Sequence, residues 1–160
     1  MPAETSGTTA EVVVISDSVR GLPSSVDVAA IAPGMFSASS SGFGQGAVLN
    51  QDNSPNSAAN PARAGSLIQI FATGLGPTDP PIATAQSGAS KPPFHRTIAM
   101  PVVLIGGVPA DVLFAGLAPG SVGLYQINAR VPILAPAGSA VSLEIRVGDQ
   151  NSNTVTIAVQ

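Results

Sequence analysis

Glycine and proline recur along nearly the whole chain and constrain its fold more than any other feature. There are 17 glycines and 15 prolines among the 160 residues. Both residues interrupt helices, and the many serines, threonines and asparagines compete with a helix for backbone hydrogen bonds. The sequence therefore predicts short strands joined by turns, with helix limited to short turns.

Alternating or continuous apolar runs, bounded by Gly, Pro, Asn and Ser, mark the expected strands. Strands at intervals of roughly 8–12 residues are typical of a sandwich or barrel. We expect an all-β protein, an immunoglobulin-like antiparallel β-sandwich with long Pro/Gly/Ser-rich loops at 37–46, 51–63 and 78–96. The expected strands are 11–15, 25–31, 47–49, 67–73, 100–105, 110–115, 123–131, 140–147 and 154–159.

An internal repeat suggests how the chain is divided. Residues 10–30 and residues 141–159 both read as a strand, a polar turn and an alternating strand. We interpret 1–31 as an N-terminal β-hairpin, either the end of a preceding immunoglobulin-like domain or a strand-exchange segment. Residues 32–160 form the immunoglobulin-like C-terminal domain. The alternative is that any two hairpins look alike. The polar start, 1–7, has no basic segment, so we expect that it is no signal peptide and that the chain begins inside a longer protein.

Composition argues against several classes of function. Charged residues make up 9% of the chain, the net charge is −3, and the six Lys and Arg residues are scattered. A surface that follows nucleic-acid phosphates needs clustered cations, so we expect no nucleic-acid partner. No apolar stretch is long enough to predict a membrane span. Without cysteine, neither a disulfide framework nor a Cys-ligated zinc site is available.

The sequence contains no recognisable catalytic, cofactor-binding or metal-binding pattern. His95 is the single histidine and lies in the expected loop 78–96. No G-x-S-x-G occurs, and the nine acidic residues do not cluster. The glycine-rich segments 42–46 and 74–76 lack the lysine and the following helix of a phosphate loop. We therefore predict no catalytic residues, no cofactor and no metal, and that the protein is not an enzyme.

Two features bear on ligand binding, which stays open as an alternative. Residues 50–56 (N-Q-D-N-S-P-N) are rich in oxygen but carry one charge, so a turn built on Asx hydrogen bonds explains them better than calcium. A sugar-binding face is weakly supported because the chain has no Trp and one Tyr. Phe71, Phe114 and Tyr125 lie on expected strands, where we predict core positions, and the Tyr125 hydroxyl could tie a corner of the fold.

A set of motifs in a fixed order points to a known family. The motifs are A-P-G-M-F (32–36), G-A-V-L-N-Q-D (46–52), N-P-A (60–62), F-A-T-G-L-G (71–76), I-G-G-V-P-A (105–110), G-L-A-P-G (116–120), G-L-Y-Q-I-N (123–128) and S-N-T-V-T-I (152–157). Through them, the chain from about 32 to 160 resembles the uncharacterised Solibacter-type C-terminal domain of secreted acidobacterial proteins. That resemblance implies an immunoglobulin-like fold of the IPT/TIG kind, an extracellular or cell-surface location and no known active site, and it likens 10–31 to the end of the domain that precedes.

These observations favour a non-catalytic extracellular module for attachment, spacing, surface display or C-terminal sorting of a secreted bacterial protein. The partner would be another protein, including other copies of the chain, joined head to tail by β-strand addition through the apolar hairpin. The alternative is a ligand-binding module that uses loops 51–63 and 78–96 for polysaccharide or calcium.

Overall fold

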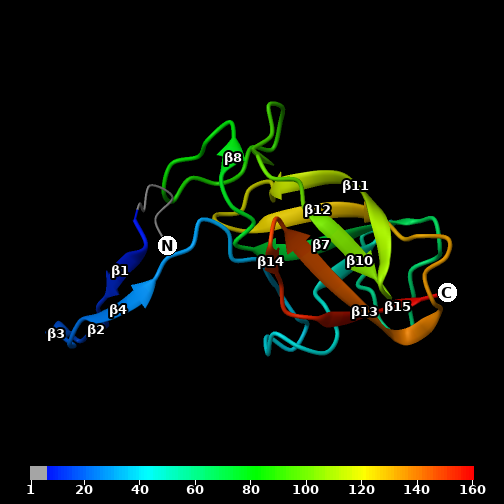
Figure 1. Cartoon of the computed structure of the whole chain (residues 1–160), viewed down its shortest axis with the longest axis horizontal. Coiled ribbons are helices and arrows are strands. Elements are labelled where there is room, and N and C mark those ends of the chain that lie inside the picture. The colour runs from blue at the N-terminus through cyan, green and yellow to red at the C-terminus, as the bar shows by residue number, and fades with distance from the viewer. Residues whose placement is uncertain (1–6) are drawn as a thin grey trace.

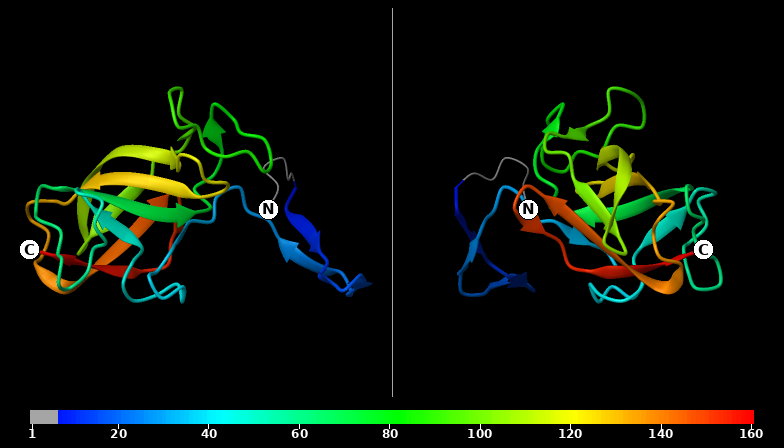
Figure 2. Two further views of the ribbon diagram at one scale, coloured as in Figure 1. Left: turned by 180° about the vertical axis from the view of Figure 1, so that it is seen from behind. Right: turned by 45° about the vertical axis from the view of Figure 1, so that its right-hand side comes forward.

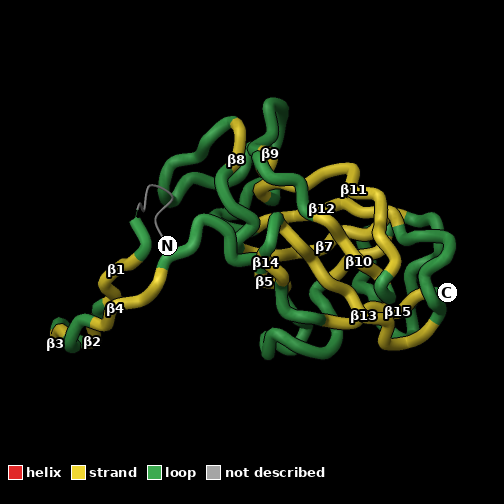
Figure 3. The backbone as a smooth tube through the Cα atoms, viewed as in Figure 1, coloured by secondary structure: helices red, strands yellow, loops and turns green. Residues whose placement is uncertain are grey.

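The computed structural model describes residues 7–160, which form strands and loops without any helix in that range (Figures 1 and 3). The all-β expectation is confirmed. The expected polar start, 1–7, lies outside the described residues except for Gly7. The strands are β1 (Thr9–Val12), β2 (Ile15–Ser16), β3 (Val19–Arg20), β4 (Ser24–Asp27), β5 (Gly34–Met35), β6 (Val48–Asn50), β7 (Leu67–Thr73), β8 (Thr78–Asp79), β9 (Arg96–Thr97), β10 (Val102–Ile105), β11 (Val108–Leu117), β12 (Tyr125–Arg130), β13 (Gly138–Val147), β14 (Gln150–Asn151) and β15 (Val155–Val159).

Eleven of these strands form one continuous antiparallel sheet. Its main order is β14-β13-β10-β11-β12-β7-β5, and β15 pairs with β13. The sheet curls strongly into a half-barrel rather than dividing into the two layers of a clear sandwich. The two long strands explain the curl, because each pairs with different neighbours along its length and carries a bulge, between Val112 and Phe114 in β11 and between Gly138 and Val141 in β13. A bulge bends a strand and increases its twist.

The concave face of the sheet holds the hydrophobic core. In β7, Ile68, Ile70 and Ala72 are buried and alternate with more exposed neighbours. In β12, Ile127 and Ala129 are buried in the same way, as the alternation in 123–131 predicts. Each buried Ile, Leu or Val stabilises the fold by roughly 1.5–3 kcal/mol. The other large, fully buried side chains are Leu75, Val103, Ile105, Val131, Leu143, Ile145, Val147, Val155 and Ile157.

Two of the three aromatic residues expected in the core lie on the other face of the sheet. Phe71 follows Ile70 in β7 and is only partly buried. Phe114 follows the bulge in β11, where it packs edge-on against Phe94, with the ring centroids 6.1 Å apart. The Arg96 guanidinium lies 5.0 Å from the centre of the Phe114 ring, so both Phe94 and Arg96 cover an aromatic face outside the core.

Backbone segments next to β6 bond to the outer edge of β15, opposite its β13 edge. The Gly46 amide donates to the Thr156 carbonyl at 2.8 Å, and the Ala62 amide donates to the Ala158 carbonyl at 2.9 Å. These bonds form two parallel bridges, Gln45 with Thr156 and Ala62 with Val159. The bridges join the first half of the domain to its last strand across the open side of the curled sheet.

Two asparagine side chains complete this seam by acting as backbone substitutes. The Asn56 side chain donates to the Ala158 carbonyl at 2.9 Å and accepts from the Ala158 amide at 2.8 Å. The Asn153 side chain accepts from the Met35 amide at 2.7 Å and donates to the Met35 carbonyl at 3.0 Å. Each side chain therefore satisfies both backbone groups of one residue, as a neighbouring strand would.

The N-terminal hairpin stands apart from this sheet (Figure 2). Strands β1 and β4 pair only with each other, and β2 and β3 form its tip. The turn is Asp17–Ser18, and both residues have positive φ. The expected strand 25–31 ends at Asp27. The hairpin does not dock on the main sheet as extra strands.

The expected strand 11–15 is divided between β1 and β2. The expected strands of the main sheet match closely, and the shortest strands were not expected. The prediction for 67–73 coincides with β7, and the Gly106-Gly107 turn joins β10 to β11 as expected. The loop expected over 78–96 contains β8 and begins β9, which pair with each other. The two-residue strands β5 and β14 were also not expected.

We expect Asn56→Ala to lower the free energy of unfolding by about 1–3 kcal/mol, because the buried Ala158 amide loses its side-chain partner. The Ala158 carbonyl keeps the bond from the Ala62 amide. Chemical denaturation measures the change. Asn151→Ala is the matched control, since Asn151 is exposed in β14 and should change stability by less than about 0.5 kcal/mol. Equal stability of the two variants would contradict the role given to Asn56.

Candidate functional site

The hairpin has one apolar and one polar face. Directly opposed residues of an antiparallel pair lie on the same face. The register pairs Ala10 with Val26, whereas Thr9 pairs with Asp27 and Glu11 with Ser25. Ala10 and Val26 therefore share a face with Val12, and the acidic residues lie on the opposite face.

The apolar face is open to solvent although its residues belong to the class that is usually buried. Val12 is 47% exposed and Val26 is 41% exposed. Towards the tip, Val14 is 72% exposed and Leu22 is 93% exposed. Ile15 and Val19 are exposed as well. Large contiguous apolar surfaces on a folded protein mark contact sites.

The linker between the hairpin and the sheet, residues 28–33, is fixed at its C-terminal end. The Ala32 amide donates to the Gly74 carbonyl at 2.9 Å. Gly74 has φ +70°, and a Cβ at this position would lie 1.9 Å from the Ala32 carbonyl oxygen. Only glycine allows this approach of the two backbones, so Gly74 sets the direction in which the linker leaves the sheet.

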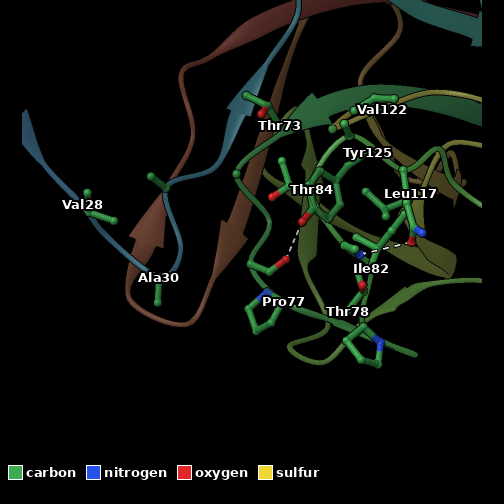
Figure 4. Close-up of a pocket in the computed structure, with 18 of the residues that line it drawn as sticks. Val28, Ala30, Thr73, Pro77, Thr78, Ile82, Thr84, Leu117, Val122 and Tyr125 are labelled. Carbon is green, nitrogen blue, oxygen red and sulfur yellow. Dashed lines mark hydrogen bonds between the residues drawn. The ribbon is translucent and has the colours of Figure 1, made fainter. Parts of the chain in front are cut away.

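A hollow of about 630 Å³ lies beneath the linker (Figure 4). Val28 and Ala30 of the linker form one side, and Ile82 and Tyr125 lie across from them. The Tyr125 hydroxyl donates to the Gly76 carbonyl at 2.5 Å, which confirms that it ties a corner of the fold. Partial burial of this side chain raises the pKa of the Tyr125 hydroxyl. The remaining lining residues are Gly7, Ala29, Ala32, Thr73, Gly74, Pro77, Thr78, Pro81, Ala83, Thr84, Ala85, Gln86, Leu117, Val122 and Gly123.

A second hollow of about 540 Å³ lies over the loop expected at 51–63. It is lined in part by Asn50, Asp52, Arg63 and Gln160. The Asp52 carboxylate accepts from the Ser54 hydroxyl and the Ser54 amide. These bonds, that from the hydroxyl first, lower the pKa of the Asp52 carboxyl. The Asx turn expected here is confirmed, and it occupies one carboxylate oxygen that a calcium ion would need.

The structure brings two charged side chains together among residues 7–160, since Arg146 lies 3.7 Å from Glu144. His95 Nδ1 lies 2.8 Å from the Pro80 carbonyl oxygen. Over residues 7–160, no three His, Cys, Asp or Glu side chains are close enough to share a metal ion. Across the same residues there is also no helix with the length and hydropathy to cross a membrane.

We expect Tyr125 to titrate above the ordinary tyrosine range, because burial disfavours the phenolate. It is the only tyrosine in a chain without tryptophan, so ultraviolet phenolate absorbance reports this group alone. A pKa raised in the folded state leaves stability unchanged below about pH 10 and reduces it as pH rises through the folded pKa. Tyr125→Phe should remove this alkaline loss. A titration at the unfolded value would contradict the burial.

Known proteins add no identification to this geometry. No family model matches the chain, and no curated protein or solved structure is detectably similar to it. The resemblance to the Solibacter-type C-terminal domain therefore has only the motifs of the sequence behind it.

Proposed function

We propose that the chain is a non-catalytic structural and interaction module of a secreted bacterial protein, with the N-terminal hairpin as its contact surface. One observation carries the proposal: the hairpin lies outside the main sheet and exposes its large apolar side chains. They are Val12, Val14, Ile15, Val19, Leu22 and Val26. Each such side chain gains roughly 1.5–3 kcal/mol on full burial, so a partner that covers several of them would bind measurably.

The hairpin also suits protein contact through its backbone. Among residues 7–160, β1 and β4 pair with no other strand, so each leaves an outer edge open. A second chain can add a strand to such an edge and supply main-chain hydrogen bonds together with apolar contact. A nucleic acid or a small polar ligand would gain little from this surface. Other copies of the same chain are the simplest partner, joined head to tail.

The immunoglobulin-like fold and the extracellular location are part of the same proposal. The antiparallel sheet, the long loops and the family resemblance support the fold, with the curled sheet as a modified sandwich. The resemblance to domains of secreted proteins supports the location. Attachment, spacing, surface display and C-terminal sorting all fit a module of this kind, without a catalytic residue, a cofactor or a metal.

A ligand-binding module is the second candidate, and the hollow beneath the linker favours it. Its volume of about 630 Å³ lies in the range of small-molecule sites. Loop 78–96 supplies one wall, through Ile82 and its neighbours. The Asx turn at Asp52 gives calcium less support than polysaccharide, because Ser54 already bonds to that carboxylate.

We expect the intact chain to self-associate and a version beginning at Ala32 to be monomeric, because the truncation removes the apolar hairpin. Light scattering over a range of concentrations measures both masses. Glu11→Gln in the intact chain is the control, since Glu11 lies on the polar face and should leave the mass unchanged. A monomer in both cases sinks the self-assembly proposal.

If the chain binds a ligand, removing residues 1–31 should abolish binding at the first hollow, because Val28 and Ala30 line it. Binding at the second hollow should survive. A glycan array and a calcium titration, each run on the intact chain and on the version beginning at Ala32, test this expectation. Blank results in both assays remove the candidate.

A further inference from the structure

Five of the six residue pairs in the hairpin recur at a constant offset in the last hairpin of the sheet. The sixth pair, Thr9–Asp27, has no counterpart, because Ala140 lies at the bulge of β13 and does not pair with Ala158. Val12 pairs with Ser24, and Leu143 pairs with Val155, with 131 positions between each residue and its counterpart. Near the turn, Ser16 pairs with Val19 as Val147 pairs with Gln150. The same offset relates Ala10–Val26 to Val141–Ile157, Glu11–Ser25 to Ser142–Thr156 and Ile15–Arg20 to Arg146–Asn151.

The irregular part of the two hairpins matches as well. In each hairpin, two residue pairs lie next to the turn. The second strand contains one extra residue between these two pairs and the pairs farther from the turn. The Gly21 amide donates to the Val14 carbonyl at 2.9 Å, and the counterpart Ser152 amide donates to the Ile145 carbonyl at 2.9 Å. A bulge at one defined place is not a general property of hairpins, which argues against the interpretation that any two hairpins look alike.

The two hairpins differ in what covers them. Val141, Leu143, Ile145 and Ile157 lie in the core. Their counterparts Ala10, Val12, Val14 and Val26 form the open apolar face. The hairpin thus has apolar residues at the positions where the last hairpin faces the core. Among the described residues, no strand of the main sheet covers them.

We infer that residues 9–28 are the closing hairpin of a second half-barrel of the same fold, and that this half-barrel is the partner of the apolar face. The inference rests on the proposed role of the hairpin as a contact surface, and it names a partner other than the copies of the chain proposed above. Within the described sheet, the seat for such a hairpin is already filled by residues 140–159, so the partner is a half-barrel whose own closing hairpin is absent.

The seat specifies how the partner binds. In the sheet, the outer edge of β13 pairs with β10, from Leu143 opposite Ile105 to Arg146 opposite Val102. The counterpart of that edge is the outer edge of residues 12–15, which pairs with no strand among residues 7–160. The partner would therefore place an antiparallel strand along residues 12–15 and its core against Val12 and Val14.

Several positions depart from the repeat. Asp27 is exposed, whereas its counterpart Ala158 is buried. Ser16 and Ser24 replace Val147 and Val155, so the end of the hairpin near the turn would pack less apolar surface. Leu22 replaces Asn153, so the side-chain amide that bonds to Met35 has no counterpart. The hairpin would hold its seat through the strand edge and the remaining apolar side chains.

A fusion chain tests the inference. Residues 32–139 are placed directly before residues 9–160, which preserves the spacing because residue 9 is the counterpart of residue 140. We expect the amides of residues 12–15 to exchange at least about a hundredfold more slowly in the fusion than in the 160-residue chain, since they then lie in an interior strand with a neighbour on both sides.

Two neighbouring substitutions give the matched control. Val14→Asp places a charge at the counterpart of the buried Ile145, and Val13→Asp places one at the counterpart of Glu144, which lies on the outer face. In the fusion, Val14→Asp should abolish the slow exchange and Val13→Asp should preserve it. In the 160-residue chain, both variants should leave exchange in the main sheet unchanged.

A second fusion carries Ser16→Val and Ser24→Val, which restore the core residues. Fast exchange of residues 12–15 in both fusions would overturn the inference. Equal effects of Val13→Asp and Val14→Asp would also overturn it. Neither outcome depends on whether the 160-residue chain self-associates, so a failure of the inference can be distinguished from a failure of the proposed function.

Discussion

The curled sheet depends on a seam in which side-chain amides take the place of a strand. Asn56 bonds to both backbone groups of Ala158, and Asn153 bonds to both backbone groups of Met35. Without them, the Ala158 amide and both backbone groups of Met35 would lose these hydrogen bonds, at a cost of about 1–3 kcal/mol for each buried group left without a partner. Asn56 is itself buried, so its hydrogen bonds cannot be replaced readily by water.

Regular strands could be predicted from the sequence because their periodicity is local. The run that forms β7 alternates Ile68, Ile70 and Ala72 inward, and its bounds were predicted correctly. The same alternation places Phe71 outward, yet its aromatic character suggested a core position, and periodicity proved the better guide. Two-residue strands such as β5 carry no period, because their partners elsewhere in the chain define them.

The curl and the seam could not be predicted, since both arise from contacts between distant segments. The bulge beside Leu113 leaves no mark in the apolar pattern, and it lets one strand serve two neighbours. Asn56 stands in a polar run whose composition suggested only a turn. The hollow beneath the linker likewise depends on Gly74. In the sequence, the segment 74–76 stood out only as a poor match to a phosphate loop. The apolar hairpin, in contrast, was visible in the sequence, because its alternation is local.

The seam also has a consequence for the order of events during folding. Asn56 and Ala158 are 102 residues apart in the chain, and Met35 and Asn153 are 118 apart. Contacts over such separations carry a large loop-closure cost and slow the folding of β-proteins. β15 is the last strand of this sheet to leave the ribosome, so the earlier strands must wait, incompletely bonded, until it arrives. The half-barrel therefore cannot complete its sheet until β15 has been synthesised.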